Sequence, residues 1–343
     1  MRIERLDVVP YALPFKEPYV TARGRLERRE LALVRVRAGN SEGLGEAAPL
    51  ALRGGATLAQ IVSELERCGS LIAGASPAEV SAPPGLSPQA RLGIELALLD
   101  LNAKLDGVEA FELLDDPKPG PVRCNATLST GPPEQVAERA AEWAALGFET
   151  FKLKAGVPGD VDQVTAVRAA LGAAAKLRID ANASWTVGEA QERLEAMGPL
   201  ELAEQPVATV REMAELRACT DVPLSADEIV TNPAEARAAA SACDVATVKL
   251  AKVGGIATAF AIARELPVYL SSALDGPVGI AAAAHVAQAL PDAGFAHGLA
   301  TSLLFGDTIA ARECTVAGGH LHLTGGPGLG VEIDEAALER CRM

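Results

Sequence analysis

The sequence predicts an α/β protein, a (β/α)8 (TIM-type) barrel with an N-terminal α+β capping domain that the C-terminal tail completes. From about residue 121, eight short apolar runs alternate with alanine-rich helical segments, and this is the strand count of such a barrel. The chain has 343 residues, which suits a barrel of about 250 residues plus a smaller unit. The alternative is an open doubly wound sheet, but no GxGxxG phosphate loop opens the first unit.

The predicted barrel strands are the eight apolar runs, at residues 122–128, 150–155, 176–180, 200–204, 223–227, 245–250, 268–272 and 295–299. The predicted helices fill the gaps between them, at residues 133–146, 161–174, 187–196, 210–219, 233–242 and 256–265. In a barrel of this kind the active site lies at the carboxyl ends of the strands. The residues that end each run are therefore the candidates for function.

The chain before the barrel has a different pattern. Residues 2–14, 31–37 and 43–48 read as strands of an antiparallel meander, and residues 15–28 read as a loop. Two helices are predicted to follow, at 57–73 and at 89–105, and the second is apolar nearly all round, so it should be buried. We expect a capping domain at residues 1–115, a barrel at 116–312 and a segment at 313–343 that returns to the capping domain.

Composition excludes some functions. The formal net charge of −14 argues against a nucleic-acid surface or an anionic membrane patch. The six cysteines form no CxxC pair, so they indicate neither a zinc site nor a disulfide framework. No signal peptide and no long apolar span is evident, so a cytoplasmic location is expected.

Three carboxylates end three consecutive predicted strands: Asp180, Glu204 and Asp227. A single acid at a strand end is often a helix N-cap, and that is the alternative for Asp180 or Asp227 alone. Three in successive strands converge on one point, where carboxylate-only ligation suits a hard cation, Mg²⁺ or Mn²⁺. The sequence therefore predicts a metal site at the mouth of the barrel.

Lysines lie in the strands on either side of these acids. Lys152 and Lys154 are two residues apart in the second run, so they point to the same side of a strand. Their mutual repulsion is expected to lower the pKa of at least one of them, unless the pair only faces solvent. Lys249 belongs to the sixth run, across the barrel mouth. Opposed lysines would remove the proton next to a substrate carboxylate, for racemisation, β-elimination or cycloisomerisation.

These residues resemble the enolase superfamily and, within it, the muconate-lactonizing-enzyme subgroup. The matching stretches are Lys152-Leu153-Lys154, Asp180-Ala181-Asn182, Glu204-Gln205-Pro206, Asp227-Glu228 and Lys249 followed by Gly254-Gly255. The resemblance implies that Lys154 and Lys249 are the acid/base lysines and that Lys152 and Asn182 support them. It also implies that a loop near residues 16–25 contacts substrate. The family is commonly homo-oligomeric, and the sequence leaves the oligomeric state of this protein open.

Other residues bear on the substrate, which is expected to be a small-molecule carboxylate. Ser271 and Ser272 end the seventh run and Gly298 lies near the end of the eighth, and both stretches resemble members of the subgroup that dehydrate a succinyl-bearing cyclohexadiene carboxylate. Arg23 offers a partner for a second carboxylate, and His297 lies close enough to the eighth strand end to touch substrate. The alternatives are a racemase or epimerase using the same residues, and a non-catalytic barrel that only binds.

Overall fold

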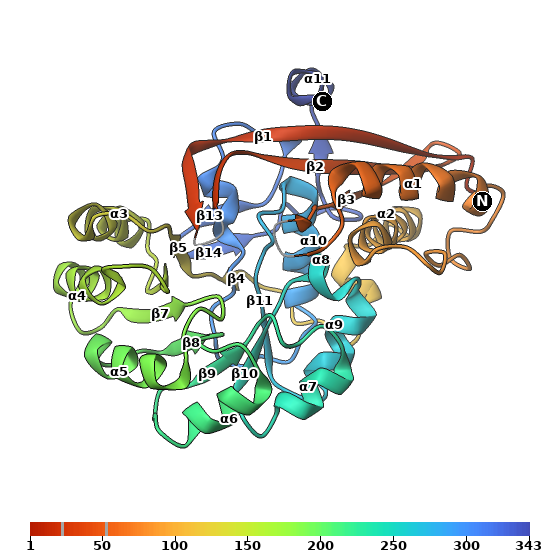
Figure 1. Ribbon diagram of the computed structural model, residues 1–343. Coiled ribbons are helices and arrows are strands. Elements are labelled where there is room, and N and C mark those ends of the chain that lie inside the picture. The colour runs from red at the N-terminus through yellow and green to blue at the C-terminus, as the bar shows by residue number, and fades with distance from the viewer. Residues whose placement is uncertain (22–23, 52–53) are drawn as a thin grey trace.

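A long antiparallel hairpin lies across one side of a curled parallel sheet (Figure 1). The computed structural model describes residues 1–21, 24–51 and 54–343. Strands β1 (Arg5–Thr21), β2 (Gly24–Ala38) and β3 (Ser41–Ala47) form the antiparallel sheet in the order β1-β2-β3. The predicted loop at 15–28 is wrong for the residues described there, because β1 extends to Thr21 and β2 begins at Gly24, with an irregular register between Pro14 and Tyr19.

Helices α1 (Leu58–Ile72) and α2 (Pro88–Asp106) complete the N-terminal unit. Each begins where a hydroxyl side chain caps it, Thr57 for α1 and Ser87 for α2. Helix α2 is buried along most of its length, as predicted, because β3 lies directly against it. A Cβ on Gly45 would lie 2.0 Å from the carbonyl oxygen of Gly93, so only glycine permits this approach. The unit therefore has a core of its own.

The barrel strands are parallel, and each pairs with its neighbours in chain order. They are β5 (Ala126–Leu128), β6 (Thr150–Lys154), β7 (Lys176–Asp180), β8 (Leu202–Glu204), β9 (Leu224–Ala226), β10 (Val245–Val248) and β11 (Val268–Leu270). The helices that follow them are α3 (Pro133–Ala145), α4 (Asp160–Leu171), α5 (Val187–Met197), α6 (Val210–Arg217), α7 (Pro233–Ala239), α8 (Leu250–Val253), α9 (Ile256–Ala263) and α10 (Pro277–Ala287). This confirms the predicted fold.

The eighth predicted strand, at 295–299, is reduced to two isolated bridges. His297 pairs with Cys124, and Gly298 pairs with Ser271. The backbone N–H of Asn125 donates to the carbonyl of His297 at 2.8 Å, and the N–H of Gly298 donates to the carbonyl of Leu270 at 2.8 Å. The segment thus bonds to both edges of the seven-stranded sheet and closes the barrel. It does not continue as a strand, because the chain turns into the short helix η3 (Ala300–Leu304).

The first predicted barrel run also divides, since β4 (Val122–Arg123) pairs with the C-terminal segment instead. That segment forms four short strands and a helix: β12 (Ala310–Arg312), β13 (Thr315–Ala317), β14 (His320–His322), β15 (Glu332–Ile333) and α11 (Glu335–Cys341). The N–H of Met343 donates to the carbonyl of Pro10 at 3.1 Å, and α11 lies beside β1 (Figure 1). The end of the chain therefore contacts the N-terminal sheet.

Two side chains of helix α2 anchor the N-terminal unit to the barrel. The side-chain amide of Gln89 donates to the carbonyl of Ala251 at 2.8 Å, and Glu95 accepts from the N–H of Ile256 at 3.0 Å. A short helix, η2 (Ala110–Leu113), joins the two units. Within the described part of the chain, no helix is both long and apolar enough to cross a membrane.

Candidate active site

The three carboxylates predicted as metal ligands lie at adjacent strand ends and are fully buried. Asp180 and Glu204 are the last residues of β7 and β8 and are directly paired in the parallel register. Asp227 follows β9 at once, and the three residues are 1%, 1% and 0% exposed. Buried carboxylates need compensating positive charge. The barrel supplies it from neighbouring strands.

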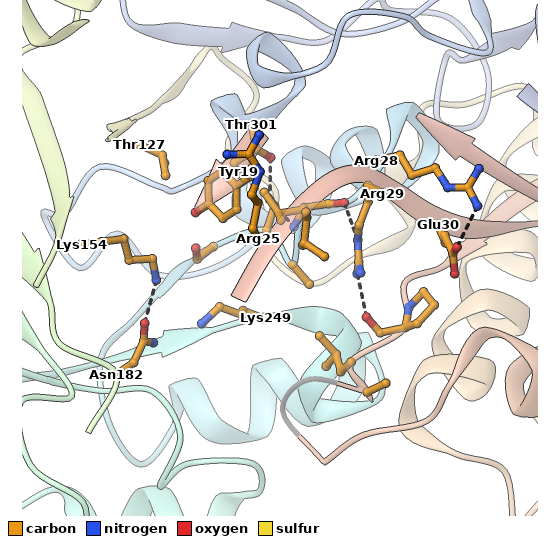
Figure 2. A pocket seen from close by; sticks show the side chains of 18 of the residues that line it. Tyr19, Arg25, Arg28, Arg29, Glu30, Thr127, Lys154, Asn182, Lys249 and Thr301 are labelled. Carbon is orange, nitrogen blue, oxygen red and sulfur yellow. Dashed lines mark hydrogen bonds and ion pairs between the residues drawn. The ribbon is translucent and has the colours of Figure 1, made fainter. Parts of the chain in front are cut away.

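Lys152 and Lys154 both point into the barrel mouth from β6, as their spacing predicts. The ammonium group of Lys152 lies 2.6 Å from each carboxylate oxygen of Glu204 and 3.1 Å from Asp180. That of Lys154 lies 2.6 Å from Asp180 and 3.0 Å from the side-chain oxygen of Asn182 (Figure 2). The expected proximity of these five residues is therefore present in the structure.

Lys249 stands on the other side of the carboxylates. It follows β10 and caps α8, and its ammonium group bonds to Asp227 and lies 4.0 Å from Glu204. Lys252, one helical turn later, also bonds to Asp227, at 2.8 Å. Asp227 thus contacts two lysines, Lys249 and Lys252. Lys154 contacts Asp180, at the other side of the three-carboxylate cluster.

The neighbouring carboxylates, rather than Lys154, dominate the pKa of Lys152. Burial lowers the pKa of Lys152, but the carboxylates of Asp180 and Glu204 outweigh burial and raise it well above its ordinary value. Burial likewise opposes the charged form of Asp180, yet Lys152 and Lys154 hold its pKa below the ordinary range. At Lys152, the carboxylate of Glu204 within hydrogen-bond distance therefore outweighs any repulsion by Lys154.

The donor set fits a hard divalent cation. Asp180, Glu204 and Asp227 offer carboxylate oxygens only, which is the ligand chemistry that Mg²⁺ and Mn²⁺ prefer. Across the described residues, no three acidic, histidine or cysteine side chains stand at the spacing of a formed metal cage. The ammonium groups of Lys152 and Lys249 lie against the same oxygens instead, so these carboxylates are already arranged around positive charge.

Residues just beyond the strand ends have a left-handed backbone without being glycine. They are Asn182, Ala183, Gln205 and Leu274, with φ between 39° and 62°. Such conformations cost about 1–3 kcal/mol and persist only where the surroundings fix them. Gln205 shows how: its side-chain oxygen accepts from the N–H of Asp227 at 2.9 Å and its amide donates to the carbonyl of Val207 at 2.8 Å. Sequence reasoning gave Gln205 no role, although it follows Glu204 directly.

A cavity of about 610 Å³ opens above these residues, between the barrel mouth and the N-terminal hairpin. The barrel contributes Thr127, Lys152, Lys154, Asp180, Asn182, Lys249, Ser271, Ser272, Ala273, Leu274 and Thr301, and the N-terminal unit contributes Tyr19, residues 25–30, 49–51, Thr57 and Leu58. Figure 2 shows Lys154 and Lys249 pointing into it below Tyr19 and Arg25. The volume is that of a small-molecule site.

The predicted substrate-binding residues have different positions. Ser271 and Ser272 line the cavity, and the hydroxyl of Ser272 hydrogen bonds to that of Thr301 at 2.5 Å. Gly298 is not among the described residues that line it. A Cβ on Gly298 would lie 2.7 Å from the hydroxyl oxygen of Ser271, so the structure gives it a packing role. Arg23 lies outside the described residues.

Arg29 is a cavity residue that sequence reasoning missed. It comes from β2, and its guanidinium donates to the carbonyls of Leu274 at 3.2 Å and Pro49 at 2.8 Å (Figure 2). It therefore joins the hairpin to the loop after β11. The only sequence signal is an arginine between the predicted loop at 15–28 and the predicted strand at 31–37.

His297 does not take the expected place beside substrate. Its ring nitrogen Nδ1 accepts the N–H of Leu270 at 3.0 Å, and it is not among the described residues lining the cavity. Burial lowers its pKa to about 4, so it remains neutral near pH 7. His285 is also buried, and its Nδ1 accepts the N–H of Phe111 at 3.2 Å. These two histidines support the structure of the barrel.

A capped barrel whose strand ends carry three buried carboxylates between lysines is the arrangement that the enolase superfamily resemblance implies. Residues 135–337, more than half of the chain, match the family model described as Enolase C-terminal domain-like. The chain belongs to this family.

Individual relatives differ in what they are named for. The o-succinylbenzoate synthase of Mycobacterium ulcerans (strain Agy99) is 42% identical over 218 residues, which are 59% of this chain and 65% of that relative. The match thus spans slightly less than two thirds of that relative's length.

Among solved structures, the muconate lactonizing enzyme of Pseudomonas fluorescens complexed with muconolactone is 27% identical, with a TM-score of 0.92 over 100% of this chain and 99% of that chain. The dipeptide epimerase of Enterococcus faecalis V583 complexed with Mg and the dipeptide L-Leu-L-Tyr is also 27% identical, with a TM-score of 0.88 over 97% and 100% of the two chains. Both likenesses cover the N-terminal unit as well as the barrel.

Proposed function

We propose that this protein is a metal-dependent lyase that removes the proton next to a substrate carboxylate. The observation that carries the proposal is the placement of Lys154 and Lys249 on the two sides of the carboxylate cluster, both lining one cavity. Asp180, Glu204 and Asp227 would hold Mg²⁺ or Mn²⁺. When bound, the cation supplies positive charge where negative charge develops on the substrate carboxylate.

The specific reaction we propose is that of o-succinylbenzoate synthase, in menaquinone biosynthesis in the cytoplasm. The substrate is 2-succinyl-6-hydroxy-2,4-cyclohexadiene-1-carboxylate, which loses water to become aromatic. Lys154 takes the proton from the carbon that bears the carboxylate. The same ammonium group then protonates the hydroxyl leaving the adjacent carbon, so the elimination is syn and the base is regenerated.

The other residues bind and orient. The positive charge of Lys249 faces the opposite side of the substrate and stabilises the negative charge that develops there. Lys152 and Asn182 hold Asp180, Glu204 and Lys154 in place through the contacts described above. Ser271, with the neighbouring backbone, lines the cavity and would bind the succinyl carboxylate.

Two observations favour this substrate over others in the same subgroup. The 42% identical relative is an o-succinylbenzoate synthase, and the Ser271-Ser272 stretch lines the cavity. A dipeptide epimerase usually carries an Asp-x-Asp after the eighth strand to bind the substrate amine, and this chain has His297-Gly298-Leu299 there. Muconate cycloisomerisation would use the same lysines without a succinyl site.

The second candidate function is racemisation of N-succinyl amino acids. Its supporting observation is also the pair Lys154 and Lys249, because two opposed bases can remove a proton from one face and return it to the other. Nothing in the carboxylate cluster separates this reaction from the elimination. The distinction depends on the substrate that the cavity accepts.

The test is to incubate the purified chain with Mg²⁺ and the cyclohexadiene substrate and to follow aromatisation by ultraviolet absorbance. Parallel samples contain single enantiomers of N-succinyl amino acids in D₂O, followed by NMR for exchange of the α-proton and by optical rotation. The proposal expects fast aromatisation that Lys154→Ala abolishes. Racemisation without aromatisation would replace it by the second candidate, and neither reaction would leave the chain a binding protein.

A further inference from the structure

A layer of hydroxyl groups lies beneath the site, one step deeper in the barrel. Ser225, Thr247 and Tyr269 each stand two residues before a site residue on their strands, namely before Asp227, Lys249 and Ser271. Side chains two apart on a strand point the same way, so these three point into the barrel interior. All three residues are 0% exposed.

The three hydroxyls form a continuous chain that ends on Glu204. Ser225 and Thr247 are joined through their oxygens at 2.8 Å. Thr247 donates to Tyr269 at 2.6 Å, and Tyr269 donates to Oε2 of Glu204 at 2.6 Å. A carboxylate only accepts and each hydroxyl has one proton, so every donor is assigned and Ser225 must donate to Thr247. The chain therefore runs in one direction, toward the carboxylate.

Tyr269 is itself held firmly. The guanidinium of Arg178 lies over its ring at 5.0 Å from the centroid. Arg178 is fixed in turn by Glu201 at 2.5 Å and by the carbonyl of Ala296 at 2.7 Å. The phenol oxygen thus has a defined position relative to the strand that carries Glu204.

We propose that Ser225, Thr247 and Tyr269 form a positioning relay that orients the Glu204 carboxylate for binding a divalent cation. This rests on the proposed function, which makes Glu204 a metal ligand. Lys152 contacts both oxygens of Glu204, so it does not by itself distinguish one from the other. Tyr269 contacts only Oε2, and in doing so it limits rotation of the carboxylate and leaves Oε1 on the side of Lys249.

The geometry favours a role beyond filling the barrel. Apolar side chains of the same shape would remove the buried hydroxyls at little cost in stability, because an internal hydrogen bond contributes little net free energy. Partners that orient a metal ligand do affect binding, and losing one typically weakens metal affinity about 10–100-fold. If the relay acts as proposed, losing a hydroxyl weakens metal affinity because the Glu204 carboxylate is no longer held in one orientation.

The test is the affinity of the full chain for Mg²⁺ alone, measured by calorimetry without substrate. Tyr269→Phe, which removes only the hydroxyl, is expected to weaken Mg²⁺ binding about 10–100-fold. Tyr11→Phe is the matched control: Tyr11 is also 0% exposed and donates to a buried carboxylate, Glu46, at 2.7 Å, away from the metal ligands. We expect the Tyr11 variant to bind Mg²⁺ as the unaltered chain does.

Variants of the two relay residues farther from Glu204 extend the test. Thr247→Val and Ser225→Ala should weaken Mg²⁺ binding by successively smaller factors, and Thr247→Val replaces the Tyr269 variant if that one does not fold. Unchanged affinity in the variants, or an equal loss in Tyr11→Phe, would overturn the relay while the metal site stands. Failure of the unaltered chain to bind Mg²⁺ would overturn the metal site, and with it the proposed function and the relay.

Discussion

The two halves of the cavity are built differently. On the barrel half, Lys152 and Lys154 have side chains only 7% and 8% exposed, and each contacts a fully buried carboxylate. On the N-terminal half, Arg25 and Arg28 have side chains 63% and 61% exposed, and each pairs with a glutamate two residues away on its own strand. The lysines of the barrel half belong to a network of buried charge, whereas Arg25 and Arg28 of the N-terminal half form local, solvated pairs.

This difference separates chemistry from recognition. Removing one member of a buried pair leaves an uncompensated charge, which costs roughly 3–5 kcal/mol. Exposed ion pairs contribute about 0–1 kcal/mol, so their residues can change with little effect on folding. The barrel half is therefore suited to keep one reaction geometry, and the N-terminal half is free to vary with the substrate.

The largest expected effect is on turnover, from the barrel half. Lys154→Ala and Lys249→Ala should each lower turnover by about 10³-fold or more. The first removes the base that takes the proton, and the second removes the positive charge that stabilises the developing negative charge. Mg²⁺ binding, measured by calorimetry, should persist in both. Lys176→Ala, at the opposite end of β7 with a half-exposed side chain, is the control. Comparable turnover in all three variants would contradict the assignment of bases.

The next effect is on the buried charge network itself. Asp227→Asn keeps the shape of the side chain but leaves Lys249 and Lys252 against a neutral amide. We expect roughly 3 kcal/mol lower stability to urea and weaker Mg²⁺ binding by at least about tenfold. Asp244→Asn, in a partly exposed pair with Arg217 at the far end of the barrel, should leave Mg²⁺ affinity unchanged. Equal effects of the two substitutions would remove the distinction between buried and exposed pairs.

A third effect lies where the two halves meet. Glu46, on β3, accepts from the hydroxyl of Tyr11 at 2.7 Å and from the N–H of Gly276 at 2.6 Å, just before α10. Burial, and then the nearby Asp275 carboxylate, raise the pKa of Glu46 from 4.5 to about 7, while Arg29 lies in the same group of charges. This carboxyl joins the N-terminal sheet to the loop after β11.

The raised pKa of Glu46 determines how the stability of the protein changes with pH. Between about pH 4.5 and 7 the folded protein binds more protons at Glu46 than the unfolded chain does, so stability falls as pH rises through this range. The loss approaches about 3 kcal/mol at pH 8. Glu46→Gln should flatten this part of the profile, measured by urea unfolding with a chelator at pH 5, 6, 7 and 8. A variant with the original slope would show that another group is responsible.

Sequence reasoning reached the barrel half far better than the N-terminal half. Asp180, Glu204 and Lys154 were found because strand alternation and the rule of carboxyl ends need only local sequence. Arg29 was missed because its partner Leu274 lies 245 positions away, and no local sequence pattern predicts such a contact. Arg29 itself lies between the predicted loop at 15–28 and the predicted strand at 31–37.

The errors in secondary structure have the same origin. Hairpin residues around 15–28 carry charges on exposed positions, so the alternation that marks a half-buried strand is hidden. The run at 295–299 reads as a strand, yet only His297 and Gly298 pair, because the chain leaves the sheet at once for η3. Side-chain partners such as Gln205 with Asp227 depend on loop geometry that the sequence does not state.

The smallest effect belongs to the exposed arginines of the N-terminal half. Arg28→Ala removes a 61% exposed side chain whose ion pair with Glu30 is 3.5 Å long, so stability should change by no more than about 0.5 kcal/mol. Because Arg28 still lines the cavity, its loss should raise KM for a substrate with two carboxylates while kcat stays nearly constant. Steady-state kinetics of Arg28→Ala and Lys154→Ala, measured side by side, distinguishes a role in substrate binding from a role in proton transfer. A fall in kcat at Arg28 as large as that at Lys154 would mean that the N-terminal half takes part in the chemistry, and the division between the halves would no longer hold.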